Sequence, residues 1–221
     1  MVFILDLTIT LQPMTELATL ERLNRYRKTY LAMLLTSIAS LCASLVLAIE
    51  AIDLAKNANA KFACDVNAVV SCGKVAKSWQ SNLLGFPNPF LGLMLESVII
   101  TVAILGLSRV ELPKRFLKVA LIGYGAGFLF AMWLFSQSYF VIKAFCPWCL
   151  IVTISTITVF STMLRVNLFE NTFNLAQEKQ LKVEAFLTRG WDHVIVAGIY
   201  TIMLTAVFFK YGKYFLPTIG G

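Results

Sequence analysis

Two pairs of cysteines are the residues of this sequence that could do redox or nucleophilic chemistry. Cys146 and Cys149 stand three residues apart, a spacing that on a helix places two Cα atoms about 5 Å apart, within reach of a disulfide. Cys64 and Cys72 are eight residues apart, about 12 Å along a continuous helix, so they can pair only if Cys64 lies on a bend. Both pairs therefore suggest thiol–disulfide exchange, in which a thiolate is the attacking species.

Local signals place both pairs at the ends of helices. Pro147 suits the first position of a helix, so we expect Cys146 to be the N-cap residue, where the positive end of the helix dipole favours the thiolate. Asp65 or Asn67 is a candidate N-cap for a short amphipathic helix that carries Cys72 on the outer surface. We expect this segment to form a movable lid.

The composition predicts that these cysteines lie in a membrane protein. Apolar residues make up 58% of the chain and charged residues 14%, and the mean hydropathy is +0.76, which no soluble domain would show. Apolar runs of the length of a membrane-spanning helix indicate five spans. They are Tyr30–Ile49, Phe90–Leu107, Val119–Ile142, Phe145–Leu164 and Val194–Phe209.

The basic residues predict how the chain is oriented. More Lys and Arg flank the spans on the side of the N-terminus than on the other side, so the N-terminus is expected in the cytoplasm. Membrane topology thus explains the net charge of +7 without a nucleic-acid partner, and a multi-pass protein of the plasma membrane is expected. Both cysteine pairs then face the oxidising, outer side.

The spans and their orientation divide the chain into regions. The expected divisions are an N-terminal tail (1–28), a four-helix core (29–165) with an outward loop (50–89), a cytoplasmic connector (166–193), a fifth span (194–209) and an outward tail (210–221).

Other readings of the same residues remain open. Four thiolates could hold a structural zinc ion, but the lone histidine, His193, is expected on the cytoplasmic side, and we expect no metal. Two structural disulfides could instead brace a non-enzymatic bundle such as a small transporter, although the spans hold almost none of the ionisable residues that mark transport paths. Gly123, Gly125 and Gly127 suggest close helix packing or a kink. Cys42, in the middle of the first span, is expected to have no redox role.

The arrangement of these residues resembles the vitamin K epoxide reductase family over about residues 25–165. The fifth span resembles only that of bacterial members, in which it leads to an outward thioredoxin-like domain. Because the chain ends shortly after this span, we expect a separate thioredoxin-fold partner of the DsbA kind on the outer side. The residues that carry the resemblance are Cys64–Asp65, Ser71–Cys72, Ser78, Pro87–Asn88, Gly92 and Phe145–Cys149.

The resemblance implies a fold and a route for electrons. The fold is an all-α membrane bundle, with four helices around a quinone site near the outer surface and a fifth helix outside. Electrons are implied to pass from the partner's dithiol to Cys64 and Cys72, then to Cys146 and Cys149. The acceptor is a membrane quinone, which could be menaquinone, ubiquinone or a form of vitamin K, and Cys149 is the residue that faces it.

Three more positions bear on the implied site. Asn88 corresponds to an asparagine that hydrogen-bonds a quinone oxygen and so stabilises negative charge there. Ser78 matches a serine near the loop dithiol, whose hydroxyl could bond a thiolate. Thr153 stands where animal members have a tyrosine, which argues against epoxide reduction. We therefore expect the chain to support disulfide formation in exported proteins, the alternative being reduction of vitamin K quinone or epoxide by lumenal dithiols.

Overall fold

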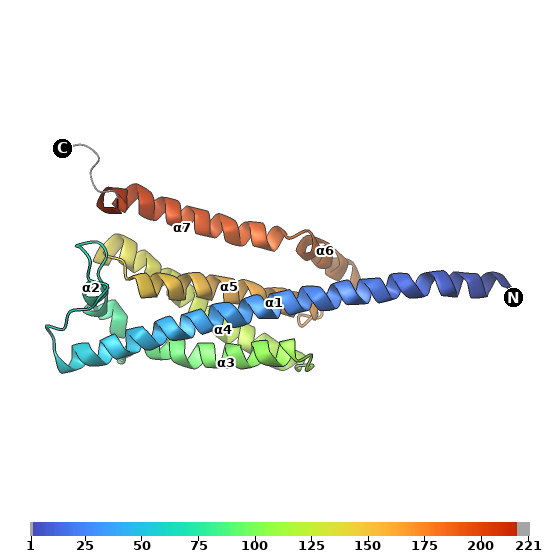
Figure 1. Cartoon of the computed structure of the whole chain (residues 1–221), viewed down its shortest axis with the longest axis horizontal. Coiled ribbons are helices and arrows are strands. Elements are labelled where there is room, and N and C mark those ends of the chain that lie inside the picture. The colour runs from blue at the N-terminus through green and yellow to red at the C-terminus, as the bar shows by residue number, and fades with distance from the viewer. Residues whose placement is uncertain (1, 216–221) are drawn as a thin grey trace.

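A computed structural model of the chain describes the backbone of residues 2–215 and the side chains of residues 26–212. Within these residues the regular elements are all helical, and most of the helices run side by side (Figure 1). In chain order they are α1 (Val2–Lys56), α2 (Cys72–Ala76), the 3₁₀-helix η1 (Trp79–Asn82), α3 (Pro89–Leu107), α4 (Lys114–Gln137), the π-helix η2 (Ser138–Ile142), α5 (Pro147–Phe169), α6 (Gln177–Thr188) and α7 (Trp191–Phe215).

The five predicted spans are confirmed as long apolar helices, in the predicted order. Most of them extend beyond the predicted bounds, because a helix continues through polar residues at which a hydropathy pattern stops. The fourth span is shifted instead: α5 begins at Pro147, and Phe145 precedes the helix. The helices that are long and apolar enough to cross a membrane are Tyr26–Lys56, Pro89–Leu107, Lys114–Ile142, Pro147–Phe169 and Trp191–Gly212.

A bundle of α1, α3, α4 and α5 forms the core, with α1 packed along α3 and α5 and with α4 packed against α5. Gly92 lets α3 approach α1, because a Cβ atom at this position would stand 2.3 Å from the Ser44 hydroxyl. The predicted close packing at Gly125 and Gly127 is confirmed, since each has a neighbouring side chain within about 3.3 Å of a Cβ position. Gly123 has open space among the described residues, so close packing at this position is wrong, and a kink there stays a prediction.

The fifth spanning helix, α7, lies outside this bundle (Figure 1). One end is fixed by Arg165 of α5, which forms an ion pair with Asp192 and lies 3.0 Å from the ring nitrogen of His193. At the other end, Lys210 and Tyr211 donate hydrogen bonds to the backbone carbonyl of Tyr139, at 2.7 and 2.9 Å. Polar contacts at both ends thus hold α7 to the bundle.

Removal of the Asp192 carboxylate is expected to destabilise the fold strongly. Arg165 and Asp192 are 6% and 12% exposed, so Asp192→Ala leaves a buried guanidinium without its counter-charge, at a cost of roughly 3–5 kcal/mol. Denaturant titration of the detergent-solubilised protein measures this loss. Glu178→Ala is the matched control, because it breaks the exposed ion pair of Glu178 with Lys182, worth about 0.3–0.5 kcal/mol. Equal losses of unfolding free energy in the two variants would contradict a stabilising role of the buried ion pair.

The helix of the loop between α1 and α3 is shorter than predicted. It spans only Cys72–Ala76, and its N-cap is Ser71, whose hydroxyl accepts a hydrogen bond from the Lys74 N–H at 3.1 Å. The expectation that Asp65 or Asn67 is the N-cap was therefore wrong. The residues before Ser71 do not join the helix and form no continuous amphipathic surface with it.

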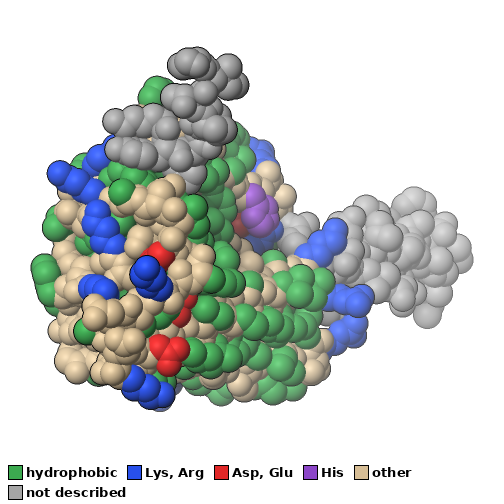
Figure 2. All heavy atoms as spheres, turned by 60° about the vertical axis from the view of Figure 1, so that its left-hand side comes forward, with side chains coloured by type: hydrophobic (Ala, Val, Ile, Leu, Met, Phe, Trp, Pro, Cys, Tyr) green, Lys and Arg blue, Asp and Glu red, His purple; other side chains and the backbone are tan. Residues whose placement is uncertain are grey.

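Local hydrogen bonds explain why the helix begins late. The side-chain oxygen of Asn67 accepts from the N–H groups of Val69 and Val70, at 2.9 and 2.8 Å, which stabilises a turn in competition with a helix. Val70 then pairs with Phe145 in an isolated parallel bridge. Figure 2 views the end of the molecule where these loops lie: charged and polar side chains gather there, and the flank of the bundle beside them is largely hydrophobic.

Candidate active site

Three of the four predicted cysteines meet in one buried cluster. Cys64 lies on a turn, as expected, and forms a disulfide with Cys72 across a Cα–Cα distance of 5.6 Å. The Sγ atom of Cys72 is also 3.0 Å from that of Cys146. Cys149, the fourth, packs against this cluster from the first turn of α5, whereas Cys42 is exposed on α1. The chain thus brings a disulfide and a pair of free thiols into contact.

Cys146 is placed to react as a thiolate. It is the N-cap of α5, with Pro147 in the first turn, as the sequence predicted. A hydrogen bond from the Cys149 thiol lowers the pKa of Cys146; burial opposes this effect, and the N–H groups of Cys149 and Trp148 add to it. A thiolate at this position lies in contact with the Cys72 sulfur, so the geometry suits attack on the loop disulfide and also its reverse.

A backbone bridge sets the distance between the two pairs. Phe145 donates its N–H to the Val69 carbonyl at 2.7 Å and accepts at its own carbonyl from the Ser71 N–H at 3.0 Å. Ser71 directly precedes Cys72, and Phe145 directly precedes Cys146. Cys72 and Cys146 are therefore each one residue from a hydrogen bond that joins their segments.

Asp65 fixes the loop that carries the disulfide. Its carboxylate accepts hydrogen bonds from the N–H groups of Phe62 (3.0 Å) and Gly73 (2.9 Å) and from the hydroxyl of Ser71 (2.7 Å). Burial opposes ionisation, but these three bonds and the charge of Lys77 outweigh it and lower the pKa of Asp65 below its ordinary value. Asp65 thus ties the turn of the loop to the start of α2.

Loss of this carboxylate is expected to loosen the loop. Because folding lowers the pKa of Asp65, its stabilising contribution is present above the unfolded-state value of about 3.9 and is lost as pH falls through the lower folded value. Hydrogen exchange of the Gly73 amide should accelerate at pH 7 in Asp65→Asn, and in the wild type only below about pH 4. Glu111→Gln, which alters an exposed carboxylate between α3 and α4, should change nothing. Unaltered exchange in Asp65→Asn would refute this role.

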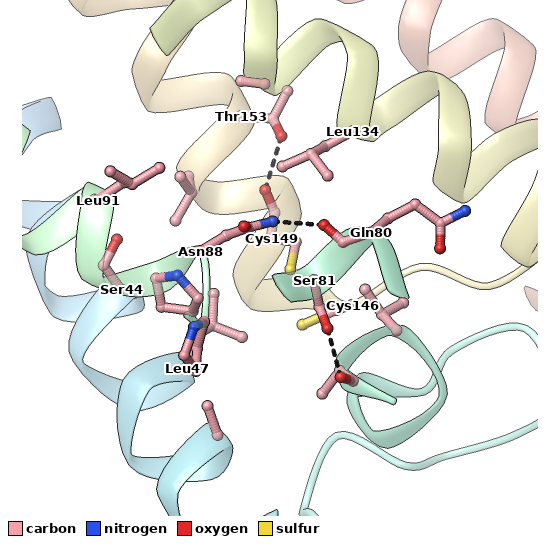
Figure 3. Close-up of a pocket in the computed structure, with 18 of the residues that line it drawn as sticks. Ser44, Leu47, Gln80, Ser81, Asn88, Leu91, Leu134, Cys146, Cys149 and Thr153 are labelled. Atoms are coloured by element: carbon pink, nitrogen blue, oxygen red, sulfur yellow. Dashed lines mark hydrogen bonds between the residues drawn. The ribbon is translucent and has the colours of Figure 1, made fainter. Parts of the chain in front are cut away.

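A cavity of about 510 Å³ opens beside the cysteine cluster. It lies among α1, α3, α4 and α5, its wall is largely apolar, and both Cys146 and Cys149 line it. Figure 3 shows these two cysteines facing the same space as Asn88 from the start of α3. The volume is in the range of cavities that hold small organic ligands, and the apolar wall with few polar groups suits an aromatic ring such as that of a quinone.

Asn88 supplies the polar group that such a ligand requires. Its amide nitrogen donates to the Gln80 carbonyl at 2.7 Å, which uses one of its two N–H bonds. Its Oδ1 atom is buried and has no hydrogen-bond partner among the described residues. Because a buried polar atom without a partner is costly, the amide of Asn88 is suited to a ligand with both a donor and an acceptor.

Ser78 and Thr153 also line this cavity, and each hydroxyl donates to a backbone carbonyl. The Ser78 hydroxyl donates to Val75 at 2.6 Å, so its proposed bond to a thiolate stays a prediction. The Thr153 hydroxyl donates to the carbonyl of Cys149 at 2.9 Å, one helical turn back (Figure 3). This bond supports the first turn of α5, where both thiols stand.

The sequence analysis missed two acidic residues in the wall of this cavity, Glu50 and Glu96. Glu96 is 2% exposed and accepts a hydrogen bond from the Tyr124 hydroxyl at 2.9 Å, although the spans were expected to hold almost no ionisable group. The sequence could have indicated this residue, because a glutamate inside the apolar run Phe90–Leu107 is an ionisable group within a span. Glu50 directly follows the predicted span Tyr30–Ile49 and was assigned to the loop, whereas α1 continues to Lys56. Apolar residues after Glu50 indicated this continuation.

Comparison with known proteins is consistent with this site. The model of the vitamin K epoxide reductase family matches residues 31–164, more than half of the chain. The matched stretch runs from α1 into α5 and includes both cysteine pairs, Ser78 and Asn88. A search of the curated proteins gave no match to this sequence.

Proposed function

Because the chain belongs to the vitamin K epoxide reductase family and is a multi-pass membrane oxidoreductase of the thiol and quinone type, we propose that it reoxidises a thioredoxin-fold partner. The partner is a separate protein of the DsbA kind on the outer side, and the electrons pass through both cysteine pairs to a membrane quinone. The observation that carries the proposal is the 3.0 Å contact between the sulfurs of Cys72 and Cys146, beside a cavity lined by Cys149.

The exposure of the cysteines supports the order of the relay. Cys64 is 8% exposed and Cys72 is 1% exposed, so a partner thiolate reaches Cys64 more easily and forms a mixed disulfide with it. The partner's second thiol then attacks this mixed disulfide. The partner leaves with its own disulfide, and Cys64 and Cys72 remain as a dithiol. Cys72 then attacks Cys146 of the Cys146–Cys149 disulfide and releases Cys149. Cys64 next bonds to Cys72 and displaces Cys146, which leaves two thiols next to the cavity.

The last step transfers two electrons and two protons to the quinone. The dithiol of Cys146 and Cys149 returns to a disulfide as the quinone becomes a quinol. The proposed role of Asn88 is to hold the ring: its remaining N–H can donate to a quinone oxygen, and its unpartnered Oδ1 can accept from a quinol hydroxyl. The cavity volume supports a ring of this size.

The proposed cellular setting follows from the distribution of charge. The excess of Lys and Arg on the N-terminal side of the spans supports a cytoplasmic N-terminus. The loop that carries Cys64 and the N-terminal end of α5 lie at the opposite end of the bundle from α6 (Figure 1). Both cysteine pairs therefore face outward, where dithiols of exported proteins are oxidised.

Quinone reduction by the purified protein tests this function. The donors are a reduced thioredoxin-fold protein and, separately, a small dithiol, and quinone loss is followed by absorbance. The proposal expects turnover with both donors in the wild type. If neither donor supports turnover with menaquinone, ubiquinone or a vitamin K quinone, the cysteines are structural, and a non-enzymatic bundle becomes the better interpretation.

A further inference from the structure

Glu50 lies against the loop disulfide at the end of the cavity. Its Oε1 atom is 3.4 Å from the Sγ of Cys64, and its Oε2 atom is buried with no partner among the described residues. From this geometry we propose that Glu50 is the proton acceptor of Cys64 when the two cysteine pairs exchange, a catalytic step that rests on the function proposed above.

The burial of the sulfur cluster creates the need for such a group. Cys64, Cys72 and Cys146 are 8%, 1% and 2% exposed, so solvent has little access to a proton on any of them. A thiol must lose its proton before it attacks a disulfide. A carboxylate in contact with the sulfur can accept that proton without water, and 3.4 Å is within the range of a hydrogen bond from a thiol.

Asp65, the other carboxylate of this region, is poorly suited to the task. Both of its oxygens already accept hydrogen bonds, from Phe62, Ser71 and Gly73, and serve to fix the loop. Glu50 has an oxygen without such a bond among the described residues. The two acidic residues next to the disulfide thus differ in role, one holding the backbone and one facing the sulfur.

A metal ion is a weaker explanation for the same atoms. A carboxylate oxygen of Glu50 and the sulfurs of Cys64 and Cys72 lie within 4.8 Å of one another, which suits a cation in principle. The sulfurs are joined in a disulfide, however, and thiolates are the sulfur ligands that metals bind. In the redox state that the structure shows, the two sulfurs are therefore poorly suited to bind a metal.

In the proposed step a proton passes from Cys64 to Glu50 and two electrons pass to the cysteine pair on α5. After Cys72 has attacked the Cys146–Cys149 disulfide, a mixed disulfide joins Cys72 to Cys146. The Cys64 thiol gives its proton to the Glu50 carboxylate, and its sulfur bonds to Cys72 while the Cys72–Cys146 bond breaks. The electron pair of that bond leaves on Cys146 as a thiolate. Two electrons have then moved from the loop pair to the pair on α5, and the structure shows the arrangement that follows this step.

The charges around Glu50 come from three segments. Asp65 on the loop and the thiols of Cys146 and Cys149 on α5 interact electrostatically with its carboxylate. Lys77, which follows α2, lines the same cavity. Without the carboxylate, Cys64 must lose its proton to solvent before it reacts, so the rate of exchange should rise more steeply with pH than in the wild type.

The test measures exchange between the pairs without any quinone. Fully oxidised protein receives one equivalent of a reduced thioredoxin-fold protein, which reacts at Cys64. The mixture is quenched with acid at set times, alkylated, and mapped for disulfides by mass spectrometry. In Glu50→Gln the exchange at pH 7 should be about 100-fold slower, and the Cys72–Cys146 mixed disulfide should accumulate. Asp53→Asn changes an exposed carboxylate three residues further along α1 and should behave as the wild type.

The results with the Glu50 variants separate the role of Glu50 from the proposed function. Slow exchange in Glu50→Gln, with a steeper pH profile and partial recovery in Glu50→Asp, supports the inference even if quinone is not reduced. Wild-type exchange rates in Glu50→Gln overturn the inference and leave the proposed function standing. If Glu50→Gln fails to fold, exchange in folded Glu50→Asp at the wild-type rate and with the wild-type pH profile overturns it as well. Absence of exchange in the wild type overturns both.

Discussion

Replacing Cys149 with alanine is expected to abolish quinone reduction with any thiol donor while leaving the bundle intact. Cys149 lines the cavity and is the only described cysteine, apart from Cys146, that is a free thiol in the site. Without it, the dithiol on α5 cannot close to a disulfide, so two electrons cannot leave together for the quinone. The variant also removes the hydrogen bond that lowers the pKa of Cys146.

The Cys149→Ala protein should reveal its block in its disulfides. After oxidation, Cys146 has no partner on α5, so we expect a stable Cys72–Cys146 linkage with Cys64 free to be alkylated. Quinone absorbance and disulfide mapping measure the two effects. Cys42→Ala, which alters an exposed cysteine of α1, is the control and should retain full activity. Normal turnover in Cys149→Ala would rule out the proposed route.

Replacing Cys64 with alanine is expected to separate the two classes of electron donor. The protein donor should lose its activity nearly completely, because Cys64 is the more exposed sulfur of the loop pair and Cys72 is only 1% exposed. A small dithiol should still support turnover, since it can enter the cavity and reduce the Cys146–Cys149 disulfide directly. The ratio of the two rates in the variant and in the wild type measures the effect.

Cys72→Ala is the matched variant that tests the order within the loop. Here Cys64 is a free thiol that can attack the disulfide of the oxidised partner, which leaves a thiolate on the partner. No neighbouring thiol of this chain can release the partner again, so a mixed disulfide between the partner and Cys64 should accumulate. Gel electrophoresis without reductant detects this complex by its mass. A complex that accumulates in Cys64→Ala but not in Cys72→Ala would reverse the assigned order.

The parts of the fold that follow from local composition were predictable. Apolar runs defined the five spans, and Pro147 placed Cys146 at the N-cap of α5, because both signals act within a few residues. The ends of the spans were less accurate. The helix α1 continues past Glu50 to Lys56, since one charged residue at a helix end does not interrupt backbone hydrogen bonds.

The details of the loop that carries Cys64 and Cys72 depend in part on contacts between residues far apart in the sequence. The segment before Cys72 was predicted to extend a helix, but the side chain of Asn67 stabilises a turn and Phe145, far along the chain, pairs with Val70. The role of Asp65 as the acceptor of three hydrogen bonds depends on the same arrangement. These residues could be identified as polar or apolar from the sequence, but their partners could not.

The backbone bridge at Phe145 has a kinetic consequence for the relay. Two sulfurs held in contact react as parts of one molecule, and well-oriented intramolecular reactions reach effective molarities of about 10⁵–10⁸ M. Transfer between the pairs can then be fast even where their redox potentials are nearly equal. The internal step would run readily in both directions, and the net flow of electrons would be governed by the supply of reduced partner at one end and of oxidised quinone at the other.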